Sequence, residues 1–477
     1  MSTRHSQPPQ LETLPGMDAS TTIALAQSGA GELTAEQEEA VTRRLESLAV
    51  SAAAGSGKTS VLVERFVRAV RDDGVAPGRI LAITFTERAA GELRARVRTR
   101  LLELGERQAA RDTEAAFVGT FHGFCARLLR AHPLAAGLDP DFEIADEGRA
   151  ARLRGLAFEE ALREFLGGDA ALAGEATERA AAIDLLAAYG VDRVRGMLER
   201  AYLELRSTGQ RLPRLPQPLL APDAEPRDVD AAHACTLLDE LLERFGSSYE
   251  RAKRARSRVD FDDLELLAQE LLGQREAVRT AWADRFELVM VDEFQDTNRR
   301  QLAILRALDR GNLFTVGDEF QSIYGFRHAD VSVFRERRRE LAEREASLSL
   351  TQNFRSREPL LDVVNALFGA RFAEFEALRA GRSETDGTGR AVELLLTDAR
   401  GWDRDGGGGE AVAPIAAGMP PAPGWRQAEA RLLAQRVGEL VRDGRARAGE
   451  VVVLLRASGD IGVYERALQL QGLRTLA

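Results

Sequence analysis

The chain has 477 residues, of which 44% are hydrophobic and 29% charged, and its formal net charge is −10 at pH 7. This is the composition of a globular protein of about three domains. It excludes a membrane-spanning protein, because no apolar run approaches the ~20 residues of a span, and a uniformly basic nucleic-acid coat. The N-terminal stretch MSTRHSQPPQLETLPGMDAS lacks the features of a signal peptide, and two cysteines, Cys125 and Cys235, form no disulfide framework or zinc set. We therefore expect a reduced, cytoplasmic protein without structural metal.

Residues 1–30 are polar, dotted with proline and aperiodic, which predicts a disordered tail. From Leu33 onward, short apolar segments alternate with segments of helical apolar spacing. We expect strands at 48–51, 80–83 and 116–119 and helices at 58–70, 87–104 and 121–131. Over residues 31–140 this alternation predicts a parallel sheet covered by helices on both faces.

The pattern changes between residues 141 and 280, where Ala, Leu, Arg and Glu dominate at helical spacing around a proline-rich break. This predicts a helical insertion. Strands are expected to return at 288–291, 313–316 and 348–350, so that residues 281–350 complete the first sheet. Residues 351–477 then contain a Gly/Pro-rich loop at 400–424, helices at 427–441 and 463–470, a strand at 451–455 and the start of another strand at 472–477.

The stretch LAVSAAAGSGKTS (residues 48–60) joins a strand, a loop of small residues and a helix start. Small residues let backbone N–H groups close around phosphate oxygens, and a helix N-terminus favours an anion. Lys58 can reach the β- and γ-phosphates of a nucleotide, and Thr59 can bind Mg²⁺. The first glycine of the usual phosphate-loop pattern is replaced by Ala52. The alternative is an ordinary glycine-rich turn. The nucleotide-binding loop predicted here comprises Ala52, Ala53, Ala54, Gly55, Ser56, Gly57, Lys58 and Thr59.

The stretch FELVMVDEFQDT (residues 286–297) places three carboxylates and an amide directly after an unbroken apolar run. With a phosphate loop in the same sheet, Asp292 can hold Mg²⁺ through water, and Glu293 can orient and deprotonate the attacking water. The bound cation would offset the negative charge at the strand end. The alternative is a solvated acidic turn. For Gln295 and Asp296 two roles stay open: coupling to neighbouring loops, or local hydrogen bonding.

These segments resemble the signature motifs of superfamily 1 DNA helicases of the UvrD/Rep/PcrA kind, including the AddA and RecB branches. Asp292–Thr297 resembles the Walker B motif of that family, and Ser51–Thr59 resembles its motif I, where alanine in place of the first glycine is normal. Further segments follow in the order of the family: Leu33–Gln37 (Q motif), Thr84–Ala90 (motif Ia, with Glu87-Arg88 for Asn-Lys), Gly119–Phe124 (motif Ib), Val259–Leu264 (preceding Walker B), Val316–Asp330 (motif III) and Gln352–Ser356 (motif IV). The resemblance covers residues 33–365 densely and 427–477 weakly.

The resemblance implies an α/β fold: a RecA-like parallel sheet of the P-loop NTPase type with a helical insertion, and a second, incomplete RecA-like lobe over residues 351–477. It implies ATP and Mg²⁺ as cofactors. Gln37 and Arg65 would contact the adenine region and Phe354 would stack on the base, while Gln37 as a simple helix-start residue is the alternative. Gln321 and Arg355 would sense the γ-phosphate, which an amide and a guanidinium can do. For Arg355 the alternative is a surface ion pair.

DNA contacts are expected in the loops between strands and helices, since single strands are held by phosphate contacts and by aromatic faces on which bases stack. The residues that match strand-contact positions of the family are Phe85, Thr86, Phe121, His122, Tyr324, Phe326 and Arg327. Phe326 stands where tryptophan is frequent. The alternative for the aromatic residues is packing in the core. Because phosphate contacts dominate such binding, we expect it to be sensitive to salt.

Motifs V and VI of the family, the second of which carries an arginine finger, are not found in the 477 residues. We therefore expect the N-terminal portion of a longer helicase, with impaired motor activity on its own. The leading interpretation is an ATP-dependent 3′→5′ helicase or translocase acting on single-stranded and duplex DNA in repair or recombination, whose partner is a nuclease or repair-complex subunit. The alternatives are an ATP-gated DNA-binding regulatory module and an unrelated phosphate-loop enzyme such as a small-molecule kinase.

Overall fold

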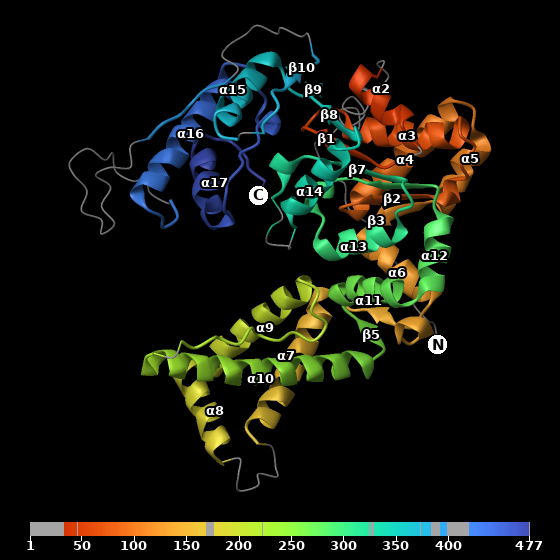
Figure 1. The fold of residues 1–477 in the computed structure, drawn as a ribbon. Helices are drawn as coiled ribbons and strands as arrows, with labels where there is room; N and C mark the ends of the chain where they lie inside the picture. The colour runs from red at the N-terminus through yellow and green to blue at the C-terminus, as the bar shows by residue number, and fades with distance from the viewer. Residues whose placement is uncertain are drawn as a thin grey trace, which may run out of the picture. The chain divides into compact units, whose positions relative to one another are not determined.

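The computed structural model describes residues 33–44, 46–167, 176–221, 223–323, 325, 329–372, 374–382, 392–397 and 419–476 (Figure 1). Its contacts divide the chain into two compact units. The first is bounded by Met1–Leu361 and Asn365–Ser383, and the second by Asp362–Val364 and Glu384–Ala477. Within the described ranges, no helix combines the length and the apolar character that crossing a membrane requires.

The first unit is built on a six-stranded sheet in which every neighbouring pair is parallel. The strands are β1 (Leu48–Ala52), β2 (Ile80–Thr84), β3 (Phe117–Thr120), β6 (Leu288–Val291), β7 (Leu313–Gly317) and β8 (Ser347–Leu350), in the order β3-β2-β6-β7-β1-β8. The expected α/β fold with a parallel sheet is confirmed. Because all six strands run the same way, the loops that follow their carboxyl ends meet at one edge of the sheet.

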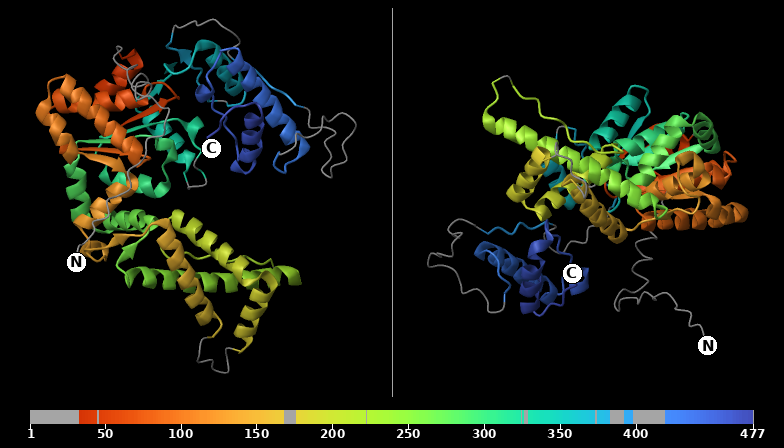
Figure 2. Two further views of the ribbon diagram at one scale, coloured as in Figure 1. Left: turned by 180° about the vertical axis from the view of Figure 1, so that it is seen from behind. Right: turned by 90° about the horizontal axis from the view of Figure 1, so that it is seen from below.

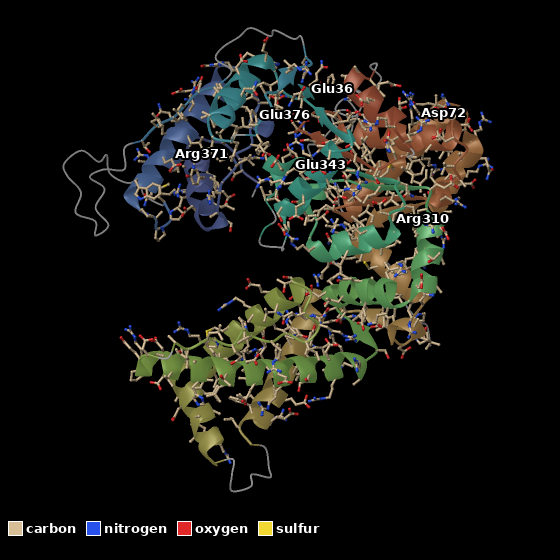
Figure 3. The ribbon with its side chains drawn as sticks, in the orientation of Figure 1. Glu36, Asp72, Arg310, Glu343, Arg371 and Glu376 are labelled. Carbon is tan, nitrogen blue, oxygen red and sulfur yellow. The ribbon has the colours of Figure 1, made fainter. Side chains whose placement is uncertain are left out.

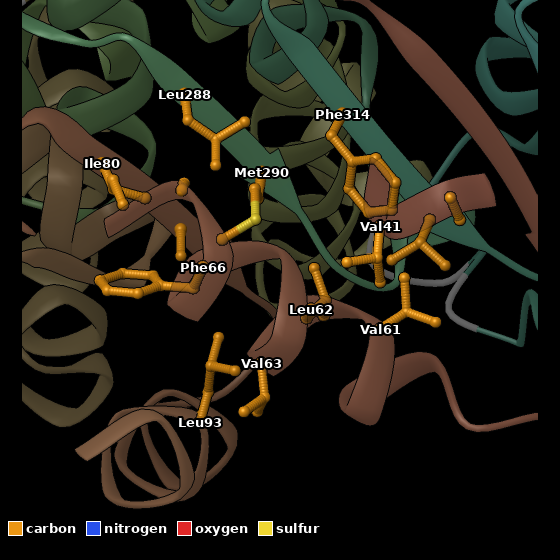
Figure 4. Close-up of a cluster of buried hydrophobic side chains, with 14 of the residues drawn as sticks. Val41, Val61, Leu62, Val63, Phe66, Ile80, Leu93, Leu288, Met290 and Phe314 are labelled. Atoms are coloured by element: carbon orange, nitrogen blue, oxygen red, sulfur yellow. The ribbon is translucent and has the colours of Figure 1, made fainter. Parts of the chain in front are cut away.

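Helices cover both faces of this sheet. Along β6, Leu288 and Met290 pack on one side while Val289 and Val291 pack on the other. The first face is covered by α2 (Ala35–Thr42), α3 (Lys58–Arg71), α4 (Glu87–Glu103) and α5 (Arg107–Asp112). The second face is covered by α6 (Phe121–Ala131), α11 (Phe261–Gln274), α12 (Glu276–Arg285) and α13 (Arg299–Leu308). Helix α14 (Val331–Ala342) contributes to both. Figure 4 shows the first core, where Phe66 of α3 faces Ile80 and Met290 of the strands.

A helical insertion interrupts the sheet between β3 and β6. Its helices are α7 (Glu147–Phe165), α8 (Ala176–Tyr189), α9 (Val191–Ser207) and α10 (Pro226–Arg254), and the short parallel pair β4 (Glu143–Ile144) and β5 (Arg258–Val259) stands where the chain enters and leaves them. These helices share a hydrophobic core of their own, which includes Phe158, Leu198, Tyr202 and Phe245. Figures 1 and 2 show them gathered as one group.

Past β8, the first unit adds the short parallel pair β9 (Gln352–Asn353) and β10 (Arg379–Ala380); α15 (Glu358–Gly369) lies between them in the chain and has residues in both units. The second unit contains α16 (Gly424–Arg442) and α17 (Ile461–Leu470), which pack through Ala434 and Val437 against Tyr464 and Leu468.

The strand expected at 451–455 is not formed. Val451, Val453 and Leu455 lie partly buried against α16 and α17, while Val452 and Leu454 are 78% and 89% exposed. The alternation typical of a strand is therefore present, but among the described residues no neighbouring strand pairs with it. Residues 473–476, expected to begin another strand, are likewise unpaired.

Candidate nucleotide site

The phosphate loop connects β1 to α3 through two glycines in left-handed conformations. Gly55 has φ +76° and Gly57, the N-cap of α3, has φ +86°. A Cβ at Gly57 would lie 2.6 Å from Nε2 of Gln37, so a side chain there would displace that amide and would also be strained by the positive φ. The Ser56 hydroxyl is turned back to donate to the Ala53 carbonyl at 2.7 Å. Within the described residues no side chain caps the N-terminus of α3. Its first N–H groups are therefore free to bind an anion, and Lys58 and Thr59 stand in the same first turn.

Glu293 meets Lys58 at this loop. The Lys58 ammonium lies 3.0 Å from Oε2 of Glu293. Glu293 has φ +50° and ψ +44°, a left-handed conformation that costs a non-glycine residue energy and turns its carboxylate away from the line of β6. Its backbone N–H donates to Oδ1 of Asp292 at 2.9 Å. The sheet thus brings together the loop lysine and the acidic strand end, as the sequence predicts.

Burial raises the pKa of Asp292 to about 6, with a further contribution from the neighbouring Glu293 carboxylate and a partial offset from Lys58. Asp296 behaves in the same way: burial and then Glu293 raise its pKa to about 6. Oδ1 of Asp296 is buried and has no hydrogen-bond partner among the described residues. This edge therefore holds three carboxyl groups with one nearby ammonium. A divalent cation placed there would favour the ionised forms of these carboxyl groups.

A chain of amide contacts links Glu293 to the loop after β7. Gln295 is 2% exposed, and its Nε2 donates to Oε2 of Glu293 at 2.8 Å. Its Oε1 accepts from the backbone N–H of Asp318 at 2.9 Å, and Oδ2 of Asp318 accepts from Nε2 of Gln321 at 2.5 Å. Gly317 leaves the space for this chain, because a Cβ there would lie 2.4 Å from Oε1 of Gln295. Gln321 is therefore connected to the expected general base through two buried residues, Asp318 and Gln295.

The predicted adenine contacts are placed differently from one another. Gln37 uses both ends of its amide on the protein: Oε1 accepts from the Thr34 N–H at 3.0 Å, and Nε2 donates to the Ser56 carbonyl at 2.8 Å. Gln37 thus contacts the phosphate loop itself and also caps α2. Phe354 is 38% exposed beside the loop, where its N–H donates to the Gly55 carbonyl at 2.8 Å.

Arg65 lies in the interior rather than at a nucleotide-facing surface. It is 0% exposed, its guanidinium donates to the carbonyls of Ala40 and Arg44, and its Cζ stands 4.3 Å from the centre of the Phe314 ring. Burial, and then the charge of Arg44, lowers its pKa to about 9. Nη1 and Nη2 of Arg65 tie α3 to α2 and to the segment after it, and the adenine contact expected for Arg65 stays a prediction.

The candidate DNA contacts that fall in the described ranges gather beside the acidic edge. Phe85 is half-buried and Thr86 caps α4 through its hydroxyl, whereas Phe121 is 8% exposed and forms part of the second core. The structure therefore favours the core alternative for Phe121. His122 is partly exposed, with Nε2 3.3 Å from Oε1 of Glu265. Tyr324, Phe326 and Arg327 lie outside the described residues.

A small cavity of about 50 Å³ joins these two groups of residues. Its lining includes Phe85 and His122 on one side and Asp292, Glu293 and Asp296 on the other. The candidate DNA contacts and the candidate hydrolytic carboxylates therefore line the same cavity.

The sequence did not lead us to a network of hydrogen bonds and an ion pair that is centred on Glu265. Glu265 is 2% exposed and accepts from Gln301 Nε2 at 2.6 Å and from Asn298 Nδ2 at 3.3 Å, while Arg300 stands 3.2 Å away. Asn298, Arg300 and Gln301 directly follow the Walker B segment. The row Asn298–Gln301 has the pattern of a capping box at the start of α13, so the sequence gives no signal that these side chains also reach a buried carboxylate.

The parallel sheet, the glycine loop at the N-terminus of α3 and the lysine–carboxylate pair across the strand ends are features of the P-loop nucleoside triphosphatase fold. The family model of the UvrD/REP helicase N-terminal domain matches residues 33–342, more than half of the chain. The chain belongs to this family.

Individual relatives carry helicase names. DNA helicase II of Escherichia coli is 30% identical, with 91% of this chain and 50% of that protein covered. The ATP-dependent DNA helicase PcrA of Leuconostoc citreum is 32% identical over 70% of this chain and 38% of that protein. A subunit of an ATP-dependent helicase/nuclease from Syntrophomonas wolfei is 28% identical over 70% and 38%. The chain thus spans between 38% and 50% of the length of these relatives.

Proposed function

We propose that this chain binds ATP with Mg²⁺ at the phosphate loop and couples its hydrolysis to movement along single-stranded DNA, as a 3′→5′ helicase or translocase in repair or recombination. The observation that carries the proposal is the contact between Lys58 and Glu293. This contact supports the proposal, because the lysine expected to bind phosphate and the carboxylate expected to act as the base are 3.0 Å apart. The direction of movement and the repair role rest on the family resemblance.

Each side chain has a role that its position supports. The N–H groups at the start of α3 and the Lys58 ammonium bind the phosphates, with Thr59 and Asp292 as the residues that would hold Mg²⁺. The cation supplies charge neutralisation of the phosphate oxygens when bound. Glu293, whose carboxylate is fixed by Gln295, orients the attacking water and accepts its proton. Gln321 and Arg355 contact the terminal phosphate, and Phe354 provides a face for the base.

Phe85, Thr86 and His122 are the described side chains that we propose as strand contacts. They line or border the cavity that also holds Asp292 and Glu293. The proposed contacts at Tyr324, Phe326 and Arg327 complete this set. A base that stacks on Phe85 would then lie close to the hydrolytic carboxylates, which provides a short route by which DNA can change the rate of hydrolysis.

The test is ATP hydrolysis by this chain with and without single-stranded DNA, with the Glu293→Gln variant as a control that keeps shape and removes the base. The proposal predicts Mg²⁺-dependent hydrolysis that DNA stimulates and that Glu293→Gln reduces by at least about 100-fold. Hydrolysis that is equal in the variant and the unchanged chain would overturn the assignment of Glu293.

A second candidate is an ATP-gated DNA-binding module that does not move along DNA. It predicts ATP-dependent DNA affinity without DNA-stimulated turnover, so the same assay separates the two. The similarity to helicase/nuclease subunits further suggests a cytoplasmic location and, for a partner, a nuclease or repair-complex subunit.

A further inference from the structure

The segment that carries Arg355 lies directly against the phosphate loop. The Phe354 N–H donates to the Gly55 carbonyl at 2.8 Å, and Nδ2 of Asn353 donates to the Ala54 carbonyl at 2.6 Å. Two consecutive carbonyls of the loop are therefore bound by two consecutive residues of the segment. The loop and the segment are joined residue by residue, although about 300 positions separate them along the chain.

Asn353 acts on Arg355 with the other end of the same carboxamide. Its Oδ1 accepts from the backbone N–H of Arg355 at 2.9 Å and from that of Ser356 at 2.7 Å. These two bonds form the local turn from which the Arg355 side chain projects. Asn353 is 3% exposed, and its own carbonyl accepts from the Gly381 N–H at 2.7 Å. A buried side chain that is fixed in this way transmits displacement rather than absorbing it.

Gly55 shows how close this approach is. A Cβ at Gly55 would lie 2.6 Å from Cβ of Arg355 and between 3.1 and 3.2 Å from the amide atoms of Asn353. The loop thus touches Arg355 and Asn353 at the position where it lacks a side chain. Movement of the loop backbone at Gly55 must therefore move the turn that holds Arg355.

The segment is also held from outside, so the loop is its adjustable contact. Oε2 of Glu36, labelled in Figure 3, accepts from the Thr351 N–H at 3.2 Å, and Oε1 accepts from Nη2 of Arg379 at 2.5 Å. β9 is further paired in parallel with β10. These contacts fix the backbone of β9, Asn353 included, and leave the Asn353 side chain and the Arg355 turn to follow the loop.

We propose that Asn353 is a positioning residue that makes the place of Arg355 depend on the conformation of the phosphate loop. When phosphates order the loop, the Ala54 carbonyl and Nδ2 of Asn353 keep their contact, and Oδ1 then presents the Arg355 turn to the terminal phosphate. This inference rests on the proposed role of Arg355 and deepens it. It names the device by which the site distinguishes a nucleoside triphosphate from a diphosphate.

The variant Asn353→Asp separates the two ends of the carboxamide. A carboxylate can still accept from the N–H groups of Arg355 and Ser356, but it has no donor for the Ala54 carbonyl. We measure the affinities for ADP and for a non-hydrolysable ATP analogue, each with Mg²⁺, and compare their ratio. The inference predicts that the preference for the triphosphate falls by about tenfold in Asn353→Asp.

The matched control is Asn365→Asp. Asn365 also donates through Nδ2 to a carbonyl and accepts through Oδ1 from an N–H, both of Leu378 at 2.9 Å, and it belongs to the same unit away from the loop. It should lower thermal stability and leave the preference for the triphosphate unchanged. If Asn353→Asp does not fold, Asn353→Ser keeps a local acceptor for the turn and lacks the reach to the loop, and it should show the same fall.

The variant Arg355→Ala separates failure of the inference from failure of the proposed function. Loss of preference in Arg355→Ala with the preference retained in Asn353→Asp or Asn353→Ser would overturn the inference alone. Preference retained in Arg355→Ala, or no binding of ATP by the unchanged chain, would overturn the proposed function and the inference with it.

Discussion

The ammonium of Lys58 lies 3.0 Å from the carboxylate of Glu293, although the two residues are 235 positions apart. Lys58 follows β1 and Glu293 follows β6, and β7 separates these strands in the sheet. The pair is therefore formed across the end of an intervening strand, which requires the left-handed turn at Glu293. A carboxylate that rests on the phosphate-binding lysine also offsets the charge of that lysine when phosphates do not.

Removing this lysine should weaken nucleotide binding and stop hydrolysis. In Lys58→Ala the loop keeps its N–H groups but loses its cation, and Glu293 is left beside Asp292 without a counter-charge. We expect the affinity for ATP to fall by at least about tenfold and hydrolysis to fall to background. The control is Arg71→Ala, which removes an exposed cation from the other end of α3. Equal ATP affinities for the two variants, measured by titration with a fluorescent analogue, would contradict the assignment of Lys58.

Asp296 should make stability depend on pH in a defined window. Its pKa is about 6 in the folded chain against an ordinary value of 3.8. Below about pH 4 the carboxyl is protonated in both states and costs nothing. Between pH 4 and 6 the unfolded chain ionises first, so stability falls as pH rises, and above about pH 6 the loss is complete. The full pKa difference would lower the free energy of unfolding by about 3 kcal/mol. Because Asp296 is partly exposed to solvent, we expect a loss of about 1 kcal/mol.

The variant Asp296→Asn cannot ionise and should escape this loss. Without Mg²⁺, its unfolding temperature should exceed that of the unchanged chain by a few degrees at pH 7, and the difference should shrink toward pH 4. Thermal unfolding followed by circular dichroism at four pH values measures this. A difference in unfolding temperature that is constant from pH 4 to 7 would show that the surroundings of Asp296 do not raise its pKa.

Much of the sheet and of the acidic edge could be predicted, because their signals are local. An apolar run such as Leu288–Val291 predicts a strand buried on both faces, and all four of its residues are buried. In a parallel sheet the residues after each strand must meet, so Lys58 and Glu293 could be paired without coordinates. The phosphate loop followed from small residues before a helix.

Other features depend on partners that a linear pattern does not contain. Arg65 shares a face of α3 with the buried residues Val61 and Ala69, but its charge gives no sign of burial; α2 and the turn after it offer the carbonyls that hold it at 0% exposure. Residues 451–455 have the alternation of a strand and lack a neighbour to pair with in the described part of the chain. Gln295 connects Glu293 to Asp318 because β6 and β7 are adjacent, and strand order cannot be read from one strand at a time.

Gln295 should affect turnover more than binding. In Gln295→Glu a second carboxylate replaces the amide that donates to Glu293, and it also faces the Asp318 N–H through its remaining acceptor. Repulsion between the two carboxylates should displace Glu293 or favour its protonated form. Either change weakens Glu293 as a base. We expect kcat to fall by about 10- to 100-fold with KM changed by less than about threefold. Gln435→Glu makes the same change on the exposed face of α16 and should leave both constants unchanged. A rise in KM without a fall in kcat would contradict the prediction.

Glu265 should contribute more to stability than any exposed carboxylate of α11. It is 2% exposed and accepts from Gln301 and Asn298, with Arg300 and His122 at 3.2 and 3.3 Å. In Glu265→Leu the Arg300 guanidinium, which is itself buried, keeps Asp262 and loses its second carboxylate, and two amides lose their acceptor. Breaking a buried ion pair in this way costs about 3–5 kcal/mol.

The control for Glu265→Leu is Glu270→Leu on the same helix, which removes a half-exposed pair with Arg211 and should cost below about 1 kcal/mol. The measurement is the unfolding temperature of each variant beside the unchanged chain. Because α11 and α13 pack on the second face of the sheet directly behind Walker B, the loss of stability should extend to the candidate nucleotide site. ATP should therefore raise the unfolding temperature less in Glu265→Leu than in the control. Equal unfolding temperatures for the two variants would show that Glu265 is not the anchor of this network.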